Sequence, residues 1–345
     1  MARVDLTVRG GGIFGLSIAW AAVRRGALVR VIERDRIGAG ASGGIVGAMS
    51  PHVPENWNEK KAFQLESLLM AEDWWRAVAE SSCLNPGYAR TGRLQPLPDD
   101  AAITLAQSRA DNAAILWQGR AQWQVVRAAG QGWEPASPTG LLVHDTLSAR
   151  IHPLRALLAL VAAIRASGGE VILGDAPDEG PVIWATGIAG LNDLTVALGR
   201  TAGDGVKGQA ALLRHQASGQ PQLFIDAIHI IPHDDGTVAI GSTSAQHWHD
   251  PTATDADLDA LIARARAALP ALATAPVLQR WSALRPRTPT RAPILGEWPD
   301  RPGHFIANGG FKIGFGMAPK VAEVMADLVL EGRDTIPHSF RVAAP

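Results

Sequence analysis

The chain has 345 residues, of which 47% are hydrophobic and 19% charged, with a formal net charge of −1. This length and composition are typical of a globular protein with a large core, usually divided into two domains. The near-neutral charge argues against a general attraction to nucleic acid or anionic membranes, and the single cysteine, Cys83, excludes an intrachain disulfide and a cysteine-based metal cluster.

The first predicted elements form a β-α-β unit. A strand at residues 4–8 leads into Gly10-Gly11-Gly12-Ile13-Phe14-Gly15, which satisfies the pattern G-x-G-x-x-G and opens a helix that runs to about residue 25. A second strand at residues 28–32 ends in Glu33. A glycine-rich turn between two strands, with an acidic residue after the second strand, is typical of dinucleotide-binding proteins.

Each glycine of this loop has a physical purpose in that interpretation. Gly10 permits a tight turn, Gly12 lets a pyrophosphate approach the backbone, and Gly15 lets the helix pack closely on the strand. The first N–H groups of the helix and its positive dipole end then face the phosphates, and Glu33 accepts hydrogen bonds from a ribose. The alternative is an ordinary glycine-rich turn.

The β-α-β pattern stops after residue 58 and resumes about a hundred residues later. Between these points the sequence predicts helices at 59–80 and 100–120 and strands at 91–97 and 140–144. It then predicts a helix at 154–167, strands at 170–173 and 181–185, a strand-rich region at 206–285 with a hairpin at 229–241, a helix at 255–269, a strand at 304–307 and a helix at 317–330. This order indicates a nucleotide-binding domain interrupted by a second domain.

Four short motifs follow one another along the chain: residues 10–15 with Glu33, Gly40-Ala41-Ser42, Ala185-Thr186-Gly187, and Gly309-Gly310-Phe311-Lys312. Their order resembles that of FAD-dependent amine oxidoreductases of the D-amino-acid oxidase superfamily. The segment from Ala283 to Gly296 is most similar to glycine oxidase. The resemblance covers essentially the whole chain and is weakest between residues 98 and 140.

This resemblance implies a mixed α/β (α+β) fold in which a glutathione-reductase-like, FAD-binding Rossmann domain carries an inserted antiparallel-sheet substrate domain. We expect the FAD-binding domain to comprise residues 1–58, 145–205 and 295–345. We expect the substrate-binding domain to comprise residues 59–144 and 206–294.

The resemblance also implies FAD as the cofactor, bound without a covalent link, because the cysteine that links flavin in sarcosine oxidases would fall near Leu284, where this chain has none. The helix after Gly310 and the charge of Lys312 would then face the flavin; a solvated lysine beside a surface helix is the alternative. The expected cofactor-binding residues are Gly10, Gly12, Ile13, Phe14, Gly15, Glu33, Arg34, Ser42, Gly47, Met49, Ala185, Thr186, Gly187, Gly309, Gly310, Phe311, Lys312 and Ile313.

Four residues are candidates for catalysis or substrate binding: Arg285, His229, Lys312 and His52. Arg285 matches the position of the family's carboxylate-binding arginine, and a guanidinium pairs with a carboxylate through two parallel hydrogen bonds. An ion pair at a domain boundary is the alternative. His229 and Ser244 replace a tyrosine and a methionine of glycine oxidase, which predicts a more polar wall, and His229 and His52 could instead be structural. No metal site is predicted.

The function implied is oxidation of the C–N bond of a small amino acid or N-substituted amino acid of the glycine, sarcosine and D-amino-acid class. A hydride would pass from Cα to flavin N5, the imine would be hydrolysed in water, and oxygen or another acceptor would reoxidise the flavin. Two alternatives stay open: a tRNA-modifying oxidoreductase that removes a carboxymethyl group, against which the net charge argues, and an FAD-binding subunit of a larger amine or opine dehydrogenase. We expect a cytoplasmic enzyme without a membrane span, and a homo-oligomer is compatible with the sequence.

Overall fold

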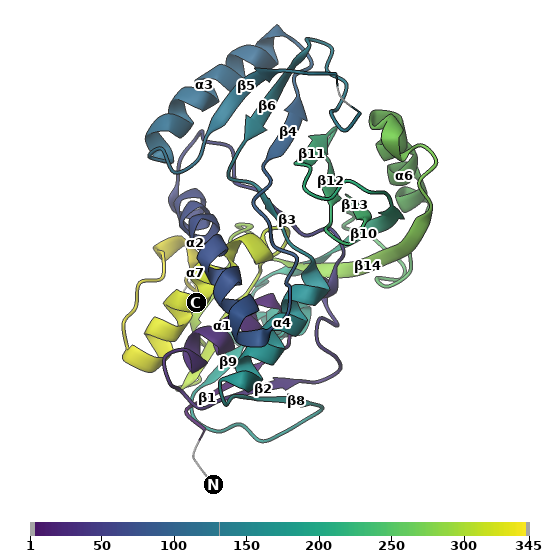
Figure 1. Cartoon of the computed structure of the whole chain (residues 1–345). Coiled ribbons are helices and arrows are strands. Elements are labelled where there is room, and N and C mark those ends of the chain that lie inside the picture. The colour runs from purple at the N-terminus through teal and green to yellow at the C-terminus, as the bar shows by residue number, and fades with distance from the viewer. Residues whose placement is uncertain (1–3, 131, 343–345) are drawn as a thin grey trace.

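A computed structural model describes residues 4–130 and 132–342 and consists of two large sheets surrounded by helices (Figure 1). The six-stranded sheet has the order β15-β16-β9-β1-β2-β8 and is parallel except for the edge pair β15 and β16. Its strands are β1 (Leu6–Arg9), β2 (Val29–Glu33), β8 (Glu170–Leu173), β9 (Val182–Trp184), β15 (Ile294–Glu297) and β16 (His304–Asn308). This is the expected nucleotide-binding sheet, assembled from three separate parts of the chain.

Four helices pack around this sheet: α1 (Ile13–Val23), α2 (Glu59–Ser82), α4 (Pro153–Ala166) and α7 (Gly314–Glu331). Every residue of α1 is buried, as expected for a helix that is apolar on all sides. Helix α2 packs against α4 and α7, and its Phe63 and Trp75 belong to the same hydrophobic core as α1. The expected domain boundary at residue 59 therefore passes through this core, and the division into domains stays a prediction.

The second sheet has eight strands in the order β14-β10-β13-β12-β11-β4-β6-β5. The strands are β4 (Arg93–Pro96), β5 (Trp123–Arg127), β6 (Leu141–Asp145), β10 (Asp204–Arg214), β11 (Gln222–Ile225), β12 (Ile228–Pro232), β13 (Thr237–Gly241) and β14 (Val277–Arg287). All neighbours are antiparallel except β4 and β11, which pair in parallel. This pair joins two distant parts of the chain, one ending at residue 145 and the other beginning at residue 204. Because no short turn connects β4 to β11, no turn fixes their register.

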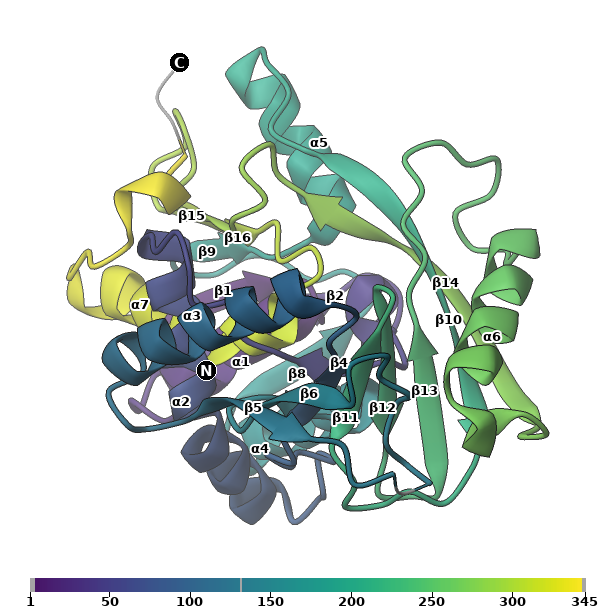
Figure 2. The same cartoon turned by 90° about the horizontal axis from the view of Figure 1, so that it is seen from above.

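Alternating side chains give the eight-stranded sheet two different faces. Ile228 and Ile230 of β12 belong to an apolar cluster that α6 (Ala256–Ala268) covers, whereas His229 between them points to the opposite face. Figure 2 shows α6 on the side of this sheet that lies away from the six-stranded sheet. The uncovered face therefore turns toward the nucleotide-binding sheet.

Several elements differ from those expected. The helix predicted at 100–120 ends at Leu116 as α3 (Asp100–Leu116), because Gln118 and Gly119 adopt positive φ angles. The last helix begins at Gly314 rather than near residue 317. Strand β5 and helix α5 (Gly187–Leu198) were not expected, and a short pair of strands, β3 (Ala48–Met49) and β7 (Ala149–Arg150), completes the fold. No helix within the described ranges is both long enough and apolar enough to cross a bilayer.

Candidate functional site

A cavity of about 1430 Å³ is lined by residues of both sheets. On the six-stranded sheet, the lining residues directly follow the carboxyl ends of the parallel strands: Gly10 after β1, Arg34 after β2, Gly174 after β8 and Ala185 after β9. Ligands of doubly wound sheets bind at this edge, because the loops and helix N-termini meet there.

Three helices that begin at the cavity, α1, α5 and α7, have N-cap residues whose own side chains do not cap the first turn. The N-caps are Gly12 for α1, Thr186 for α5 and Ile313 for α7, and none of these helices has an acidic residue in its first turn. Helices α2, α3 and α6 start elsewhere in the described structure, and each has a side chain that caps the first turn. Helix α4, whose first residue Pro153 also lines the cavity, is capped by His152. Uncapped N–H groups around one cavity are suited to an anionic ligand.

The glycines of the first loop divide into two kinds. A Cβ atom on Gly10 would lie 2.4 Å from the carbonyl oxygen of Ala185, and one on Gly15 would lie 2.1 Å from that of Gly10, so both permit close backbone packing. A Cβ atom on Gly12 would meet only the side chain of Ser42, at 3.1 Å, and Gly12 lines the cavity. Gly12 is thus the glycine that leaves space for a ligand.

Glu33 and Ser42 hold this loop in place. The carboxylate of Glu33 accepts hydrogen bonds from the N–H of Gly11, at 2.6 Å, and of Asp35, at 3.0 Å. Ser42 Oγ accepts a hydrogen bond of 3.0 Å from the N–H of Ile13. The expected contact of Glu33 with a ribose stays a prediction, and the structure adds that Glu33 fixes the glycine loop.

Nearly all the expected cofactor-binding residues lie on the cavity surface. The exceptions are Gly15 and Gly309. Gly309 has φ +75°, and a Cβ atom there would lie 2.4 Å from Thr288 Cγ2, so this glycine serves packing. The lining residues are Gly10, Gly12, Ile13, Phe14, Glu33, Arg34, Ser42, Gly47, Met49, Ala185, Thr186, Gly187, Gly310, Phe311, Lys312 and Ile313.

Strand register places the predicted substrate residues on one face of the eight-stranded sheet. His229 pairs with Gly241, Gly241 pairs with Ala210, and Ala210 pairs with Trp281, which is four residues from Arg285 on β14. Because side chains alternate along strands, Arg285, Trp281 and His229 all face the cavity, and all three line it.

Arg285 is buried, and no carboxylate of the described residues pairs with it. Its side chain crosses Gly208, where a Cβ atom would lie 1.8 Å from Nη1, and its guanidinium lies 5.9 Å from the ring centre of Trp281. Nη1 donates a hydrogen bond of 3.1 Å to the carbonyl oxygen of Thr243. Burial lowers the pKa of Arg285 to about 10, and no neighbouring charge offsets this. A buried cation without an anion is costly, and an anionic ligand would remove that cost.

His229 lines the cavity as a neutral side chain. Burial, and then the positive charges of Arg93 and Lys312, lower its pKa to about 3. Its ring packs on Phe224, with centres 4.7 Å apart, and its Nδ1 atom has no hydrogen-bond partner within the described structure. His229 can therefore donate or accept a hydrogen bond in the cavity but does not carry charge at neutral pH.

Lys312 and His52 occupy the same cavity. Burial and the charges of Arg285 and Arg291 lower the pKa of Lys312, which places its ammonium near other cations. His52 Nδ1 lies 2.5 Å from Oε1 of Gln64 on α2, and that oxygen also accepts a hydrogen bond from the N–H of His52. Burial lowers the pKa of His52 as well, so its ring is neutral and fixed by Gln64.

Some residues considered from the sequence lie elsewhere, and others were missed. Ser244 is exposed and does not line the cavity, whereas Ser242 does. Arg287 pairs with Asp204 outside the cavity. The helix start at α5, Trp281 and Arg93 were not predicted from the sequence. For Arg93, the one signal was a charge within a predicted strand.

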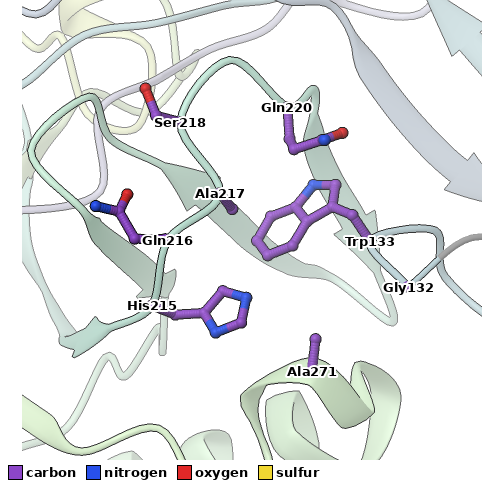
Figure 3. A pocket seen from close by; sticks show the side chains of 8 residues that line it. All are labelled: Gly132, Trp133, His215, Gln216, Ala217, Ser218, Gln220 and Ala271. Carbon is purple, nitrogen blue, oxygen red and sulfur yellow. The ribbon is translucent and has the colours of Figure 1, made fainter.

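A second cavity, of about 500 Å³, lies apart from these residues. Figure 3 shows its lining, in which the rings of Trp133 and His215 stack with centres 5.8 Å apart. None of the predicted site residues contributes to it.

Comparisons with known proteins identify sequences related to this chain. The sequence profile of the family described as "DAO: FAD dependent oxidoreductase" matches residues 5–328. A glycine oxidase of Pseudomonas putida is 25% identical over 346 residues, which are 94% of this chain and 94% of that protein. The bifunctional protein ThiO/ThiG of a Nostoc species is 27% identical over 356 residues, and the match includes 95% of this chain but only 53% of that protein. The chain thus spans about half the length of such bifunctional relatives.

Solved structures share the fold. Glycine oxidase from Geobacillus kaustophilus superposes with a TM-score of 0.83 at 20% identity and covers 99% of both chains. Iminodiacetate oxidase from Chelativorans sp. BNC1 gives a TM-score of 0.85 at 20% identity and covers 99% of this chain and 100% of the other. At 20% identity these structures show that the fold is shared.

Proposed function

Since this chain belongs to the DAO family of FAD-dependent oxidoreductases, we propose that it oxidises the C–N bond of a small amino acid or N-substituted amino acid whose carboxylate pairs with Arg285. The observation that carries the proposal is the buried guanidinium of Arg285, which faces the cavity and has no carboxylate partner in the described structure. The names of the glycine oxidase and iminodiacetate oxidase relatives support an amino-acid substrate.

The residues present fit FAD. The cavity offers the uncapped N-termini of α1, α5 and α7, space at Gly12, and a volume that accommodates a dinucleotide together with a small substrate. We assign the pyrophosphate to the start of α1 and the flavin to the start of α7. When bound, FAD supplies a two-electron acceptor for the hydrogen on the substrate Cα.

Arg285 would orient the substrate. The hydrogen bond from Nη1 to Thr243 and the packing on Trp281 leave the remaining N–H groups of the fork free to bind a carboxylate. His229, which is neutral, can donate a hydrogen bond to the same substrate. Because both groups are fixed, a bound amino acid would present its Cα in one orientation.

The charges in this part of the cavity favour a neutral amine. The eight-stranded sheet contributes arginines to the lining and no carboxylate, and Lys312 adds another cation. A substrate ammonium would therefore meet like charges, which lower its pKa and favour loss of its proton. A neutral amine has the lone pair that supports departure of a hydride from Cα. No protein group needs to remove a proton from Cα.

Anaerobic titration of the FAD-loaded protein tests this proposal. Glycine, sarcosine and D-alanine should bleach the flavin absorbance, whereas methylamine, dimethylamine and ethylamine, which lack the carboxylate, should not. Equal bleaching by the amines without a carboxylate would contradict the role of Arg285. Failure of every amino acid to reduce the flavin would contradict the proposed activity and favour a non-catalytic FAD-binding subunit.

A further inference from the structure

Arg93 is a second buried arginine on the cavity face of the eight-stranded sheet. It pairs with Gln222 of β11, two residues from Phe224, and Phe224 pairs with His229. Its guanidinium lies 5.6 Å from the ring centre of Phe224, and Arg93 lines the cavity although only 6% of its surface is exposed. Arg93 thus faces the same space as His229 and Arg285.

The guanidinium of Arg93 has N–H donors that no described residue accepts. Its Nε atom lies 2.8 Å from Oδ2 of Asp145, but the two are not aligned for a hydrogen bond. The Asp145 carboxylate already accepts hydrogen bonds from the N–H and the hydroxyl of Ser148. Neither Nη atom of Arg93 donates a hydrogen bond to any residue that the structure describes. A buried fork with unmet donors in a cavity is suited to an anionic group.

The basic groups follow one another across the cavity. The charge of Arg285 lowers the pKa of Lys312, and the charges of Lys312 and Arg93 both lower that of His229. Lys312 therefore lies within electrostatic reach of Arg285 and His229, and His229 lies within reach of Lys312 and Arg93. The acidic lining residues lie elsewhere: Glu33 ends β2, Asp35 follows it, Asp175 follows β8 and Asp193 is on α5.

Strands β10, β13, β12 and β11 separate β14, which carries Arg285, from β4, which carries Arg93. Neighbouring strands are about 4.8 Å apart, so one carboxylate cannot contact both arginines. Five inter-strand steps separate β14 from β4, so a substrate that reaches both arginines needs two anionic groups at opposite ends of an extended molecule. Resting on the function proposed above, we propose that Arg93 binds a second carboxylate of the substrate, so that the preferred substrates are amino acids with a carboxylate on the side chain or on the N-substituent.

Substrates matched in shape and different in charge test this subsite. We would compare N-(carboxyalkyl)glycines of increasing chain length with the corresponding N-(carbamoylalkyl)glycines, and both enantiomers of glutamate with those of glutamine. At the favoured length, the dicarboxylate should have a KM lower than that of its amide by about tenfold or more, because a charge-assisted contact to arginine is gained. Equal KM values for every pair would overturn the proposal.

Replacement of Arg93 then tests whether this residue causes the preference for the dicarboxylate. Arg93→Met should remove the preference for the dicarboxylate while it leaves the KM of the amide nearly unchanged. Arg90→Met is the matched control, since Arg90 donates only to backbone carbonyl groups of Thr146 and Arg120 and does not line the cavity. A dicarboxylate preference that survives in Arg93→Met would also overturn the proposal.

Because Arg93→Met leaves the carboxylate of Asp145 unpaired and buried, the double variant Arg93→Met/Asp145→Asn provides a second test. An asparagine can still accept the hydrogen bond from the N–H of Ser148, and no buried charge is left. Its FAD content and melting temperature show whether it folds, and it should lose the same preference. A non-oxidisable dicarboxylate such as glutarate should perturb the flavin spectrum of the wild type and not that of the double variant. If all substrates fail to reduce the flavin, the proposed function fails; if only the preference is absent, the subsite alone fails.

Discussion

Along the six-stranded sheet the cavity lining includes glycines and the starts of three helices, whereas along the eight-stranded sheet it includes buried charged and aromatic side chains. Gly10, Gly12 and the starts of α1, α5 and α7 present N–H groups and space. Opposite them, Arg285, His229 and Arg93 project from three different strands. The first wall suits a ligand that is the same throughout the family, and the second suits a substrate that varies.

The two walls also differ in how they tolerate change. A backbone site is lost when a side chain enters it, and most other substitutions nearby leave it intact. In a site formed by side chains, each substitution alters ligand binding but does not change the fold. Substitutions on one wall should therefore affect cofactor retention, and substitutions on the other should affect substrate use.

The largest effect is expected from Gly12→Val. A valine side chain at this position would point into the space at the start of α1, where we place the pyrophosphate, and would exclude it. The purified variant should fold but retain almost no FAD, measured as the ratio of flavin to protein absorbance. Gly132→Val is the matched control, because a Cβ atom there meets nothing within 4 Å and the residue is outside the FAD cavity. Full FAD occupancy in Gly12→Val would contradict the assignment of this loop.

Arg285→Met should impair substrate use without affecting cofactor binding. FAD should remain bound, while kcat/KM for an amino-acid substrate should fall on the order of a hundredfold, since a charge-assisted bidentate contact is lost. Arg285→Lys keeps the charge without the planar fork and should recover part of the loss. The control is Arg287→Met, which removes an arginine of the same strand that pairs with Asp204. Near-normal kcat/KM in Arg285→Met would show that another residue holds the carboxylate.

The same difference explains how much of the site could be predicted from the sequence. The glycine loop, Glu33 and the final helix are short segments whose spacing is set by local geometry, and the structure places them together at the cavity. The FAD-dependent family and the general fold are confirmed by the family profile and the structural neighbours. Thr186 and Gly187 were expected to bind the cofactor because of the family resemblance, but the helix that begins there, α5, was not predicted.

The substrate wall could not be derived in the same way. Arg93 reaches the cavity only because β4 pairs in parallel with β11, which is more than a hundred residues away in sequence. A shift of one residue in that register would turn Arg93 to the other face. Family resemblance indicated Arg285 and His229, but no local pattern indicates which strands of the sheet are neighbours. Family resemblance also indicated Ser244, which does not line the cavity, whereas Ser242, two residues earlier, does.

His233 connects the eight-stranded sheet to the cofactor side of the cavity, and its titration should make stability depend on pH. It follows β12, is fully buried, and its Nε2 atom lies 3.0 Å from the carbonyl oxygen of Ile45, which lines the cavity on the cofactor side. Burial lowers the pKa of His233 from 6.5 to about 4. Between these pH values the unfolded chain binds the proton more readily than the folded chain, so stability should decrease as the pH falls through this window and should be complete above it.

The expected loss from His233 is roughly 2–3 kcal/mol of unfolding free energy between pH 7 and pH 4. His233→Gln keeps a donor for the carbonyl of Ile45 and cannot titrate, so its melting temperature should depend less on pH in this range. The exposed His247 provides the control variant His247→Gln. If His233→Gln and the wild type have the same pH dependence, His233 does not contribute to acid destabilisation.

The smallest effect is expected from Lys312, which belongs to both walls because it follows the glycines of the last loop and lies near Arg285. If its ammonium also faces the flavin, it stabilises the negative charge of the reduced form, together with the dipole of α7. Lys312→Met should then make the reduction potential more negative by on the order of tens of millivolts and weaken the binding of sulfite to the flavin. Lys320→Met is the matched control, since Lys320 is within α7, shortly after Lys312, but pairs with Glu66, 2.8 Å away, outside the cavity. If the potential and the sulfite affinity are unchanged but KM rises, Lys312 acts on the substrate carboxylate, and the start of α7 alone provides the positive potential at the flavin.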